Sequence, residues 1–532
     1  MDGANWSRWD TVRAHRRVLA VARNVTSAGR LLDVLPVFGS DPRVQTVFTT
    51  VDGSAFNDGL DDYLSDVQAR VVPWGLAVRT EFDLALSATA NGDLHELRAP
   101  VLLMPHGAGH NRLLRTADGY SAEVSGLARS QLLRDGKVVP AAIALSHEEQ
   151  LARLERYCPE ALPFAVVTGD PCFDRLVANL PRRERYRRAL GVPEGGRLVL
   201  VSSTWGEHSL FGDSSLISRL VSDLPLDEYR VVVAAHPNVW KGYGGLQVRL
   251  WLAEARAAGL MLVPPERGWQ AALVAADVVV GDHGSVTFYG AALDRPTLLA
   301  SSGGEFAELD PLSPTAELCR LLPRVDRLRP LREQVEGVVA AHRPGAYAQV
   351  TERTLGEVGR SSELLRRTAY RLMDLPCPSG PAVPAAVPSP VGERAEVTAF
   401  LVQTEVEPGA RQVVVRRFPA TAKIPAGEPD PHLVVDVEEL DRRLLESADV
   451  IIGSGEPQEI LSRYPGCAAA ALVTGSRARV TLRDGRVVTV TGSGVDPACL
   501  PSVVYGWLAV GLPFPEELVV RAGAGETCVD VA

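Results

Sequence analysis

Lysine is nearly missing from this sequence. Of its 55 basic residues only Lys137, Lys241 and Lys423 are lysines, and the rest are arginines. With abundant Ala, Val, Gly and Pro, this bias is typical of a high-GC bacterium. No GxxxxGKS or GxxxxGKT segment occurs, which excludes a P-loop ATPase, and residues 23–33 lack the GxGxxG of a dinucleotide site. Any phosphate must therefore be held by arginine, histidine, hydroxyl groups or backbone amides.

Cysteine pairs, an apolar leader and long apolar runs are also missing. The seven cysteines are scattered without a CxxC pair, which argues against zinc and a disulfide framework and favours a reducing cytoplasm. Residues 1–17 contain no apolar segment, so we expect no signal peptide. No stretch reaches the roughly 18 apolar residues of a transmembrane helix. A formal charge of −10 argues against a nucleic-acid or anionic-membrane binder.

The chain of 532 residues is too long for one core, so we expect several domains. Short apolar runs alternate with helical stretches, which predicts βαβ units and largely parallel sheets. The expected strands are 17–24, 43–51, 69–75, 82–88 and 100–107, followed by a second series at 197–204, 229–237, 259–265, 276–282 and 296–302. The sequence thus predicts an α/β protein with two Rossmann-like domains, residues 1–180 and 181–375.

The remaining chain predicts a linker and a smaller α/β unit. Residues 351–375 have the spacing of one long amphipathic helix that closes the second unit. Residues 376–394 are rich in Pro and Ala, which is typical of a linker of polyproline character. In the last unit, residues 395–532, a hairpin is predicted to turn at Asp484-Gly485.

Polar residues stand at four predicted strand ends, where ligands bind in open α/β sheets. Each segment alone is explained by a turn or a helix cap, with Ser285 as an N-cap residue. Ten histidines scattered at random would rarely fall at such ends, so together the segments favour a ligand site. They are LLMPHGAGHNR (102–112), VVTGDPCFDRL (166–176), VVVAAHPNVWKG (231–242) and ADVVVGDHGSV (276–286).

The chemistry of these segments fits a nucleotide diphosphate. Gly284 lets backbone amides approach a phosphate, and the helix after Ser285 offers aligned N–H donors. We expect His236 to donate to the departing phosphate oxygen. His106, from the other sheet, is expected to take a proton from an incoming hydroxyl.

Together these segments resemble the GT-B class of nucleotide-sugar transferases over roughly residues 17–375. The branch most similar is that of the CDP-glycerol glycerophosphotransferases, with the UDP-GlcNAc 2-epimerases as relatives. The matching segments are Pro105-His106-Gly107, TGDPCFD (168–174) against TGxPxxD, His236-Pro237, and ADVVVGDHGSVTFYGAALDRP (276–296) against a signature that shares Asp277, Asp282, Ser285 and Pro296.

The resemblance implies roles for single residues. His106 would be the general base and His236 the second catalytic residue. The donor-binding residues would be Asp282, His283, Gly284, Ser285, Gly107 and Gly169, with Asp282 orienting the turn. The partners would be a nucleotide-diphosphate donor and a hydroxyl acceptor, without a separate cofactor or a metal. Pro105, His283 and Gly284 depart from the family's pattern, so the donor, the acceptor and a link to teichoic acid stay open.

Residues 395–532 resemble the carboxyl half of ribokinase-type sugar kinases more faintly. ADVIIGSGEPQEIL (448–461) is similar to one of their stretches, and Gly492–Asp496 stands where Gly-Ala-Gly-Asp would be. About 140 residues are too few for that domain. We therefore expect a structural or dimerising module, through which the chain would form a homo-oligomer.

Two alternatives remain open from sequence. A UDP-sugar 2-epimerase-like enzyme would need further carboxylates at the site, for which Asp83, Glu96 and Asp174 are available. A non-catalytic scaffold or regulatory protein would keep the fold without the chemistry, which the altered surroundings of His106 favour.

Overall fold

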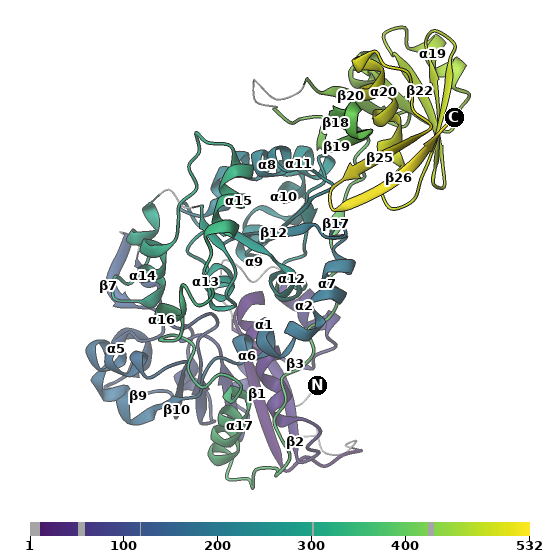
Figure 1. Cartoon of the computed structure of the whole chain (residues 1–532). Helices are drawn as coiled ribbons and strands as arrows, with labels where there is room; N and C mark the ends of the chain where they lie inside the picture. The colour runs from purple at the N-terminus through teal and green to yellow at the C-terminus, as the bar shows by residue number, and fades with distance from the viewer. Residues whose placement is uncertain (1–10, 52–58, 117–118, 301–302, 424–429) are drawn as a thin grey trace.

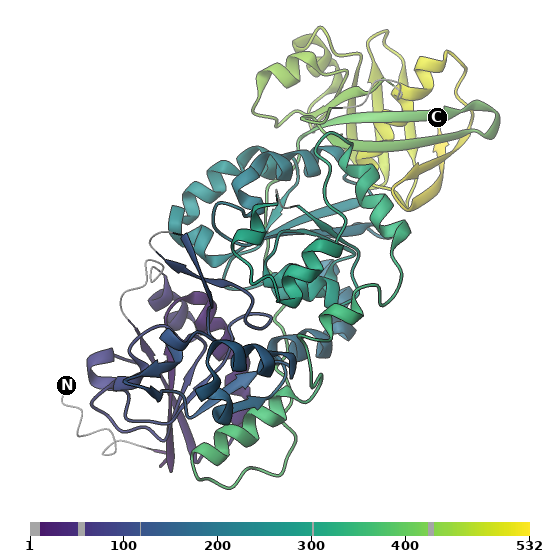
Figure 2. The same cartoon turned by 90° about the vertical axis from the view of Figure 1, so that its left-hand side faces the viewer.

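The computed structural model describes residues 11–51, 59–116, 119–300, 303–423 and 430–532. Figure 1 shows three units in a row: a sheet in purple and blue, a second in teal, and a closed sheet in green and yellow. Figure 2, turned by 90°, shows the same order. The predicted fold class, two Rossmann-like sheets followed by a smaller unit, is confirmed.

The first sheet has seven strands, all parallel, in the order β11-β10-β5-β4-β1-β2-β3. Residues 18–22 of β1, an inner strand, are fully buried, because a parallel sheet carries helices on both faces. The strands are β1 (Arg16–Ala22), β2 (Val44–Thr50), β3 (Val71–Val72), β4 (Leu84–Ser87), β5 (Val101–Leu103), β10 (Ala142–Leu145) and β11 (Ala165–Val167). Its helices include α1 (Val25–Val34), α5 (Glu149–Tyr157) and α6 (Pro171–Ala178).

The second sheet has six strands in the order β16-β15-β12-β13-β14-β17, and only the β14–β17 pair is antiparallel. The strands are β12 (Arg197–Ser203), β13 (Tyr229–Ala235), β14 (Met261–Leu262), β15 (Val278–Gly281), β16 (Thr297–Leu299) and β17 (Glu393–Arg394). Its helices include α8 (Ser214–Asp223), α9 (Pro237–Tyr243), α11 (Ala253–Ala257), α13 (Ser285–Ala292) and α15 (Leu331–Ala341).

The prediction of one long helix over 351–375 that closes the second unit is wrong. A turn with Gly359 at φ +80 separates α17 (Ser361–Leu372) from the chain before it. Leu365 and Tyr370 of α17 lie in the core under the first sheet, and Figure 1 shows the green helix beside β1 and β2. The apolar pattern predicts that one face is buried, but it does not name the surface that buries it.

The proline-rich segment 376–394 connects α17 to the last unit and also packs against the protein. Val387 is buried; its N–H donates to Asn179 Oδ1 at 3.0 Å, and its carbonyl accepts from Tyr186 Oη at 2.7 Å. The carbonyl of Ala386 accepts from Arg175 at 2.9 Å. The segment ends in β17, which adds an edge strand to the second sheet.

The last unit is a closed nine-stranded sheet in the order β18-β19-β25-β26-β24-β23-β22-β21-β20, and β18 pairs with β20 to close it. The predicted hairpin is confirmed: β23 and β24 are antiparallel, and Gly485 in their turn has φ +89. Helix α20 (Leu500–Val510) buries Leu500, Val503 and Val504 against the strands. The strands are β18 (Ala399–Glu407), β19 (Gln412–Pro419), β20 (His432–Asp436), β21 (Val450–Ile452), β22 (Ala469–Thr474), β23 (Arg477–Leu482), β24 (Val487–Thr491), β25 (Glu517–Ala522) and β26 (Gly525–Val531).

An arginine–carboxylate cluster fastens the closed sheet to the second sheet. Arg417 of β19 bonds to both Asp227 oxygens and to Asp496 at 2.6 Å, and its carbonyl accepts from Leu226 N at 2.8 Å. Within the described ranges, every helix is too short or too polar to cross a bilayer.

Candidate active site

The loop after β5 meets the turn after β15, so the carboxyl ends of the two sheets come together. The N–H of Ala108 donates to Ser285 Oγ at 3.3 Å. A Cβ at Gly107 would lie 2.4 Å from that hydroxyl, so a larger residue there would displace the Ser285 side chain. The structure therefore places Gly107 at the contact between the domains, beside Ser285.

His106 lies in this loop with an exposed side chain. Its pKa is lowered to about 4, chiefly because the surrounding protein replaces much of the water, and further by the cations Arg30 and Arg112. A hydrogen bond to the backbone of Ala88 opposes this shift in part. The imidazole is thus reachable from solvent and neutral at pH 7, as a proton acceptor must be.

His236 ends β13 in the other domain. Its Nδ1 accepts from the N–H of Asn238 at 3.0 Å and caps α9, so in the neutral ring the proton sits on Nε2. Its pKa is lowered to about 3, first by burial and then by Arg112 and His106. The two histidines from different sheets are therefore close enough to act on one another electrostatically, and Nε2 of His236 is left as a donor.

Asp282 is fully buried and holds two strand-end loops together. Its carboxylate accepts from the N–H groups of Thr204 at 2.8 Å, Leu210 at 2.9 Å and Gly284 at 3.1 Å, and from the Ser203 hydroxyl at 3.2 Å. These bonds occupy the carboxylate oxygens of Asp282 and hold the turn in place.

The turn after Asp282 leads into α13 with an uncapped amino end. Gly284 occupies the N-cap position at φ −78 and Ser285 is the first helical residue, so the interpretation of Ser285 as the cap is wrong. No side chain of the described residues caps this helix. The N–H groups of the first turn have no partner within the helix, which is the arrangement that binds anions.

His283 belongs to this turn, and its side chain is buried. Its Nε2 lies 3.2 Å from Glu308 Oε2, while Nδ1 has no partner in the described structure. Although burial raises the pKa of Glu308, His283 and Arg112 lower it overall, so the carboxylate stays charged. The structure thus places the His283 ring against Glu308.

Arg112 is the site residue that the sequence did not single out. It comes from the loop after β5 and reaches across to Glu308 at 3.0 Å and to Thr204 Oγ1 at 2.7 Å. Its guanidinium lies 5.8 Å from the centre of the Trp205 ring. Because it also lowers the pKa of both His106 and His236, it is the cation at the centre of the junction.

Comparisons with known proteins were made for the whole chain. The sequence matches no family model and no curated protein. Solved structures with similarity to this chain include the following three. The wall teichoic acid polymerase TagF is 12% identical, with a TM-score of 0.47 over 68% of this chain and 91% of that chain. HepE of Anabaena, in complex with UDP and glucose, is 14% identical with a TM-score of 0.38, over 68% and 100%. A glycosyltransferase from Rickettsia africae ESF-5 is 10% identical with a TM-score of 0.37, over 68% and 98%.

Gly169, for which a donor-binding role is expected, lies against the backbone of Gly356. Its Cβ would be 2.7 Å from the carbonyl of Gly356, and its φ is +75. The next residue, Asp170, caps α6 and pairs with Arg30 of α1 at 2.7 Å. Tyr289 of α13 donates to the same carboxylate at 2.7 Å. This part of the TGDPCFD motif therefore fastens the two domains to each other.

Gly169→Ala is expected to lower the free energy of unfolding by more than Gly345→Ala. Both positions have φ near +75, where alanine costs about 1 kcal/mol or more. Only Gly169 adds a backbone clash, because nothing lies within 4 Å of a Cβ at Gly345. Urea unfolding of both variants measures the difference. Equal losses would show that the contact with Gly356 relaxes freely.

The carboxylates available to an epimerase lie elsewhere. Asp83 accepts from the N–H of Arg17 at 2.7 Å, at the amino ends of β1 and β4, and Glu96 precedes β5. Asp174 caps α17 by accepting from Gly359 N at 2.7 Å and Ser361 N at 2.8 Å. In the part of the chain that the structure describes, no group of three His, Cys, Asp or Glu side chains is placed to hold a metal ion.

Proposed function

We propose that this chain is a GT-B-type transferase. It moves a glycosyl or glycerophosphoryl group from a nucleotide-diphosphate donor to a hydroxyl acceptor. The observation that carries the proposal is the pair of neutral histidines, His106 and His236, which approach from different sheets beside Arg112 and the uncapped end of α13. In this proposal residues 1–180 hold the acceptor and residues 181–375 the donor.

The donor's phosphates would be bound at the amino end of α13. The N–H groups of its first turn, His236 Nε2 and Arg112 are donors aimed at the same junction. Negative charge grows on the leaving nucleotide during transfer, so fixed donors stabilise the transition state more than the ground state. Ser285 Oγ now accepts from Ala108, and a phosphate would take the place of this contact as the domains separate.

The acceptor would be activated by His106. As the acceptor oxygen forms its bond to the transferred carbon or phosphorus, its proton passes to the imidazole. The bond from the transferred group to the nucleotide's phosphate oxygen breaks, and its electron pair leaves with the nucleotide. The positive charge of Arg112 helps to keep His106 unprotonated until this step.

Calorimetry with CDP, UDP, GDP and ADP tests the proposal. One of the four is expected to bind, and Arg112→Gln is expected to weaken that binding by about tenfold or more, because a charge-assisted hydrogen bond is lost. Arg115→Gln, which changes an exposed arginine of the neighbouring strand β6 (Leu113–Thr116), serves as the matched control. If none of the four nucleotides binds, the transferase hypothesis fails and a non-catalytic scaffold is favoured. Formation of an epimer without any acceptor would favour the epimerase alternative.

A further inference from the structure

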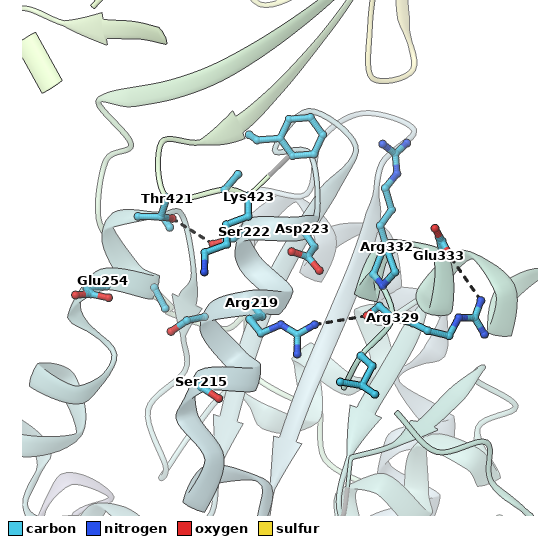
Figure 3. Close-up of a pocket in the computed structure, with 17 residues that line it drawn as sticks. Ser215, Arg219, Ser222, Asp223, Glu254, Arg329, Arg332, Glu333, Thr421 and Lys423 are labelled. Atoms are coloured by element: carbon cyan, nitrogen blue, oxygen red, sulfur yellow. Dashed lines mark hydrogen bonds and ion pairs between the residues drawn. The ribbon is translucent and has the colours of Figure 1, made fainter. Parts of the chain in front are cut away.

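A cavity of about 760 Å³ lies between the second sheet's helices and the closed sheet (Figure 3). Helix α8 forms one wall, residues 328–333 form another, and Phe418 with residues 421–423 covers them from the closed sheet. Small organic ligands occupy pockets of about 300–1,000 Å³, which are frequent where domains meet. The cavity therefore has the size and the position of a ligand site.

This cavity is remote from the junction that holds the two histidines. It is lined by Ser222 and Asp223 at the carboxyl end of α8 and by Pro330 just before α15. Arg332, also in its wall, bonds to Glu228, which directly precedes β13. These groups lie at the amino edge of the second sheet, whereas His236 follows the carboxyl end of β13. Seven residues of strand separate the two edges, which is about 20 Å.

Helix α8 turns a row of hydroxyl groups into the cavity. Ser215, Ser218 and Ser222 have the spacing of one helical face, and Arg219 lies among them. The Ser222 hydroxyl is 3.2 Å from Thr421 Oγ1, and Figure 3 shows this bond with Lys423 close by. Hydroxyl donors and acceptors from two separate units thus line the same space.

Several charged groups in the wall already have partners. Arg332 bonds to Glu336 at 2.8 Å and to Glu228 at 3.2 Å. Asp223 accepts from the N–H of Leu331 at 3.0 Å and so caps α15. These side chains build the cavity and have little capacity left for a ligand.

Two cations in the wall have no carboxylate partner among the described residues. The bonds that the Arg219 guanidinium makes there go to the carbonyl oxygens of Arg327 at 2.8 Å and Arg329 at 3.5 Å. Lys423 is exposed and has no ion pair or hydrogen bond within the described residues. Glu254 of α11 also lines the cavity, and its carboxylate has no partner among the described residues. The unpaired charge in the wall is therefore mainly positive, and the Glu254 carboxylate is available as one hydrogen-bond acceptor.

We propose that this cavity binds a phosphorylated, hydroxyl-rich small molecule, such as a sugar phosphate. Its phosphate lies between Arg219 and Lys423, which lack an anion. Its hydroxyl groups bond to the α8 serines and to Glu254, and its carbon face packs on Phe418 and nearby apolar residues. Because the ligand contacts both units, it fixes the closed sheet against the second sheet.

Calorimetry with glucose 1-phosphate, inorganic phosphate and neutral glucose tests this site. Glucose 1-phosphate is expected to bind, inorganic phosphate to bind more weakly, and glucose not measurably. Lys423→Met and Arg219→Gln are each expected to lower the affinity for glucose 1-phosphate by about tenfold or more. Lys137→Met removes an exposed lysine of β9 (Lys137–Val138) and is expected to leave the affinity unchanged.

The other outcomes overturn the proposal. The site would be excluded if the wild-type chain did not bind glucose 1-phosphate. It would also be excluded if the Lys423 and Arg219 variants bound glucose 1-phosphate as tightly as the wild type does. Equal affinity for inorganic phosphate would show that the hydroxyl groups are not recognised. Loss of binding in His236→Ala would place the ligand at the other junction. Lys423 has no partner to lose, so its variant is expected to unfold at the wild-type temperature, which thermal unfolding checks.

Discussion

His106→Ala is expected to lower turnover by about 100- to 10,000-fold while nucleotide affinity changes by no more than a few-fold. The imidazole belongs to the loop after β5, whereas the proposed phosphate donors belong to the second sheet, apart from Arg112. Its removal therefore takes away the proton acceptor without touching the amino end of α13. Single-turnover rates and calorimetry on the same preparations measure the two quantities separately.

The pH dependence of the wild-type enzyme is an independent readout of the same assignment. An ordinary histidine has a pKa of about 6.5, but that of His106 is about 4. A base works only when unprotonated, so kcat/KM is expected to stay level from pH 8 to about pH 5 and to fall as the pH approaches 4. The lowered pKa values of His106 and His236 also mean that stability, complete above about pH 6.5, declines as the pH falls. Thermal unfolding across the series separates the two effects.

His95→Ala is the matched control for His106→Ala. His95 is an exposed histidine at the amino edge of the first sheet, so its variant is expected to turn over normally. Added imidazole should restore part of the activity of His106→Ala, because the vacated position is open to solvent. Equal loss of turnover and nucleotide affinity would remove the assignment of His106 as the base.

Arg30→Met is expected to lower the free energy of unfolding by about 3–5 kcal/mol. The Arg30 and Asp170 side chains are 3% and 1% exposed, and their charged atoms lie 2.7 Å apart. Without the guanidinium, a buried carboxylate keeps only Tyr289 and the α6 backbone as partners. The loss arises mainly from that unpaired charge, since buried ion pairs themselves contribute little net stability.

Two further variants identify the cause of that loss. Arg442→Met removes an exposed arginine 3.9 Å from Glu446 on one helix and is expected to cost about 0.5 kcal/mol or less. Combining Arg30→Met with Asp170→Asn removes both charges while the cap of α6 is kept, so part of the stability should return. Urea unfolding of each variant measures the loss in free energy of unfolding. Hydrogen exchange at β1 and at β12 reports on the first and second sheets separately. If the double variant is no more stable than Arg30→Met, burial of an unpaired charge is not the reason.

Sequence patterns predict the parts of this protein that depend on local order. The apolar runs of β12 and β13 form buried strands whichever strands lie beside them in the sheet. Glycine and histidine after such runs mark the edge of the sheet at which polar residues gather. Arg30 and Arg112 could not be singled out, because they are two among many arginines and their partners lie 140 and 196 residues away. The partners exist only after the two sheets have come together.

Prediction of strands from sequence has the same limit in the C-terminal unit. Continuous apolar runs mark β20 and β21 in the sequence, whereas β19, β25 and β26 have a weaker signal. Buried and more exposed positions alternate along β19 and β25, and charged residues interrupt β26, which is typical of half-exposed strands. The closure of the sheet depends on them, so it could not be predicted. The resemblance to a kinase half and assembly through this unit stay predictions.

The position of α17 has a consequence for the order in which the protein forms during synthesis. Leu365 and Tyr370 complete the core under the first sheet, yet they are translated roughly 190 residues after β11. At about 5–20 residues per second, the first sheet waits some 10–40 s for its last helix. Meanwhile Phe38, whose ring lies tilted to that of Tyr370 with ring centres 6.0 Å apart, lacks this neighbour. The amino-terminal sheet therefore finishes folding only after most strands of the second have left the ribosome.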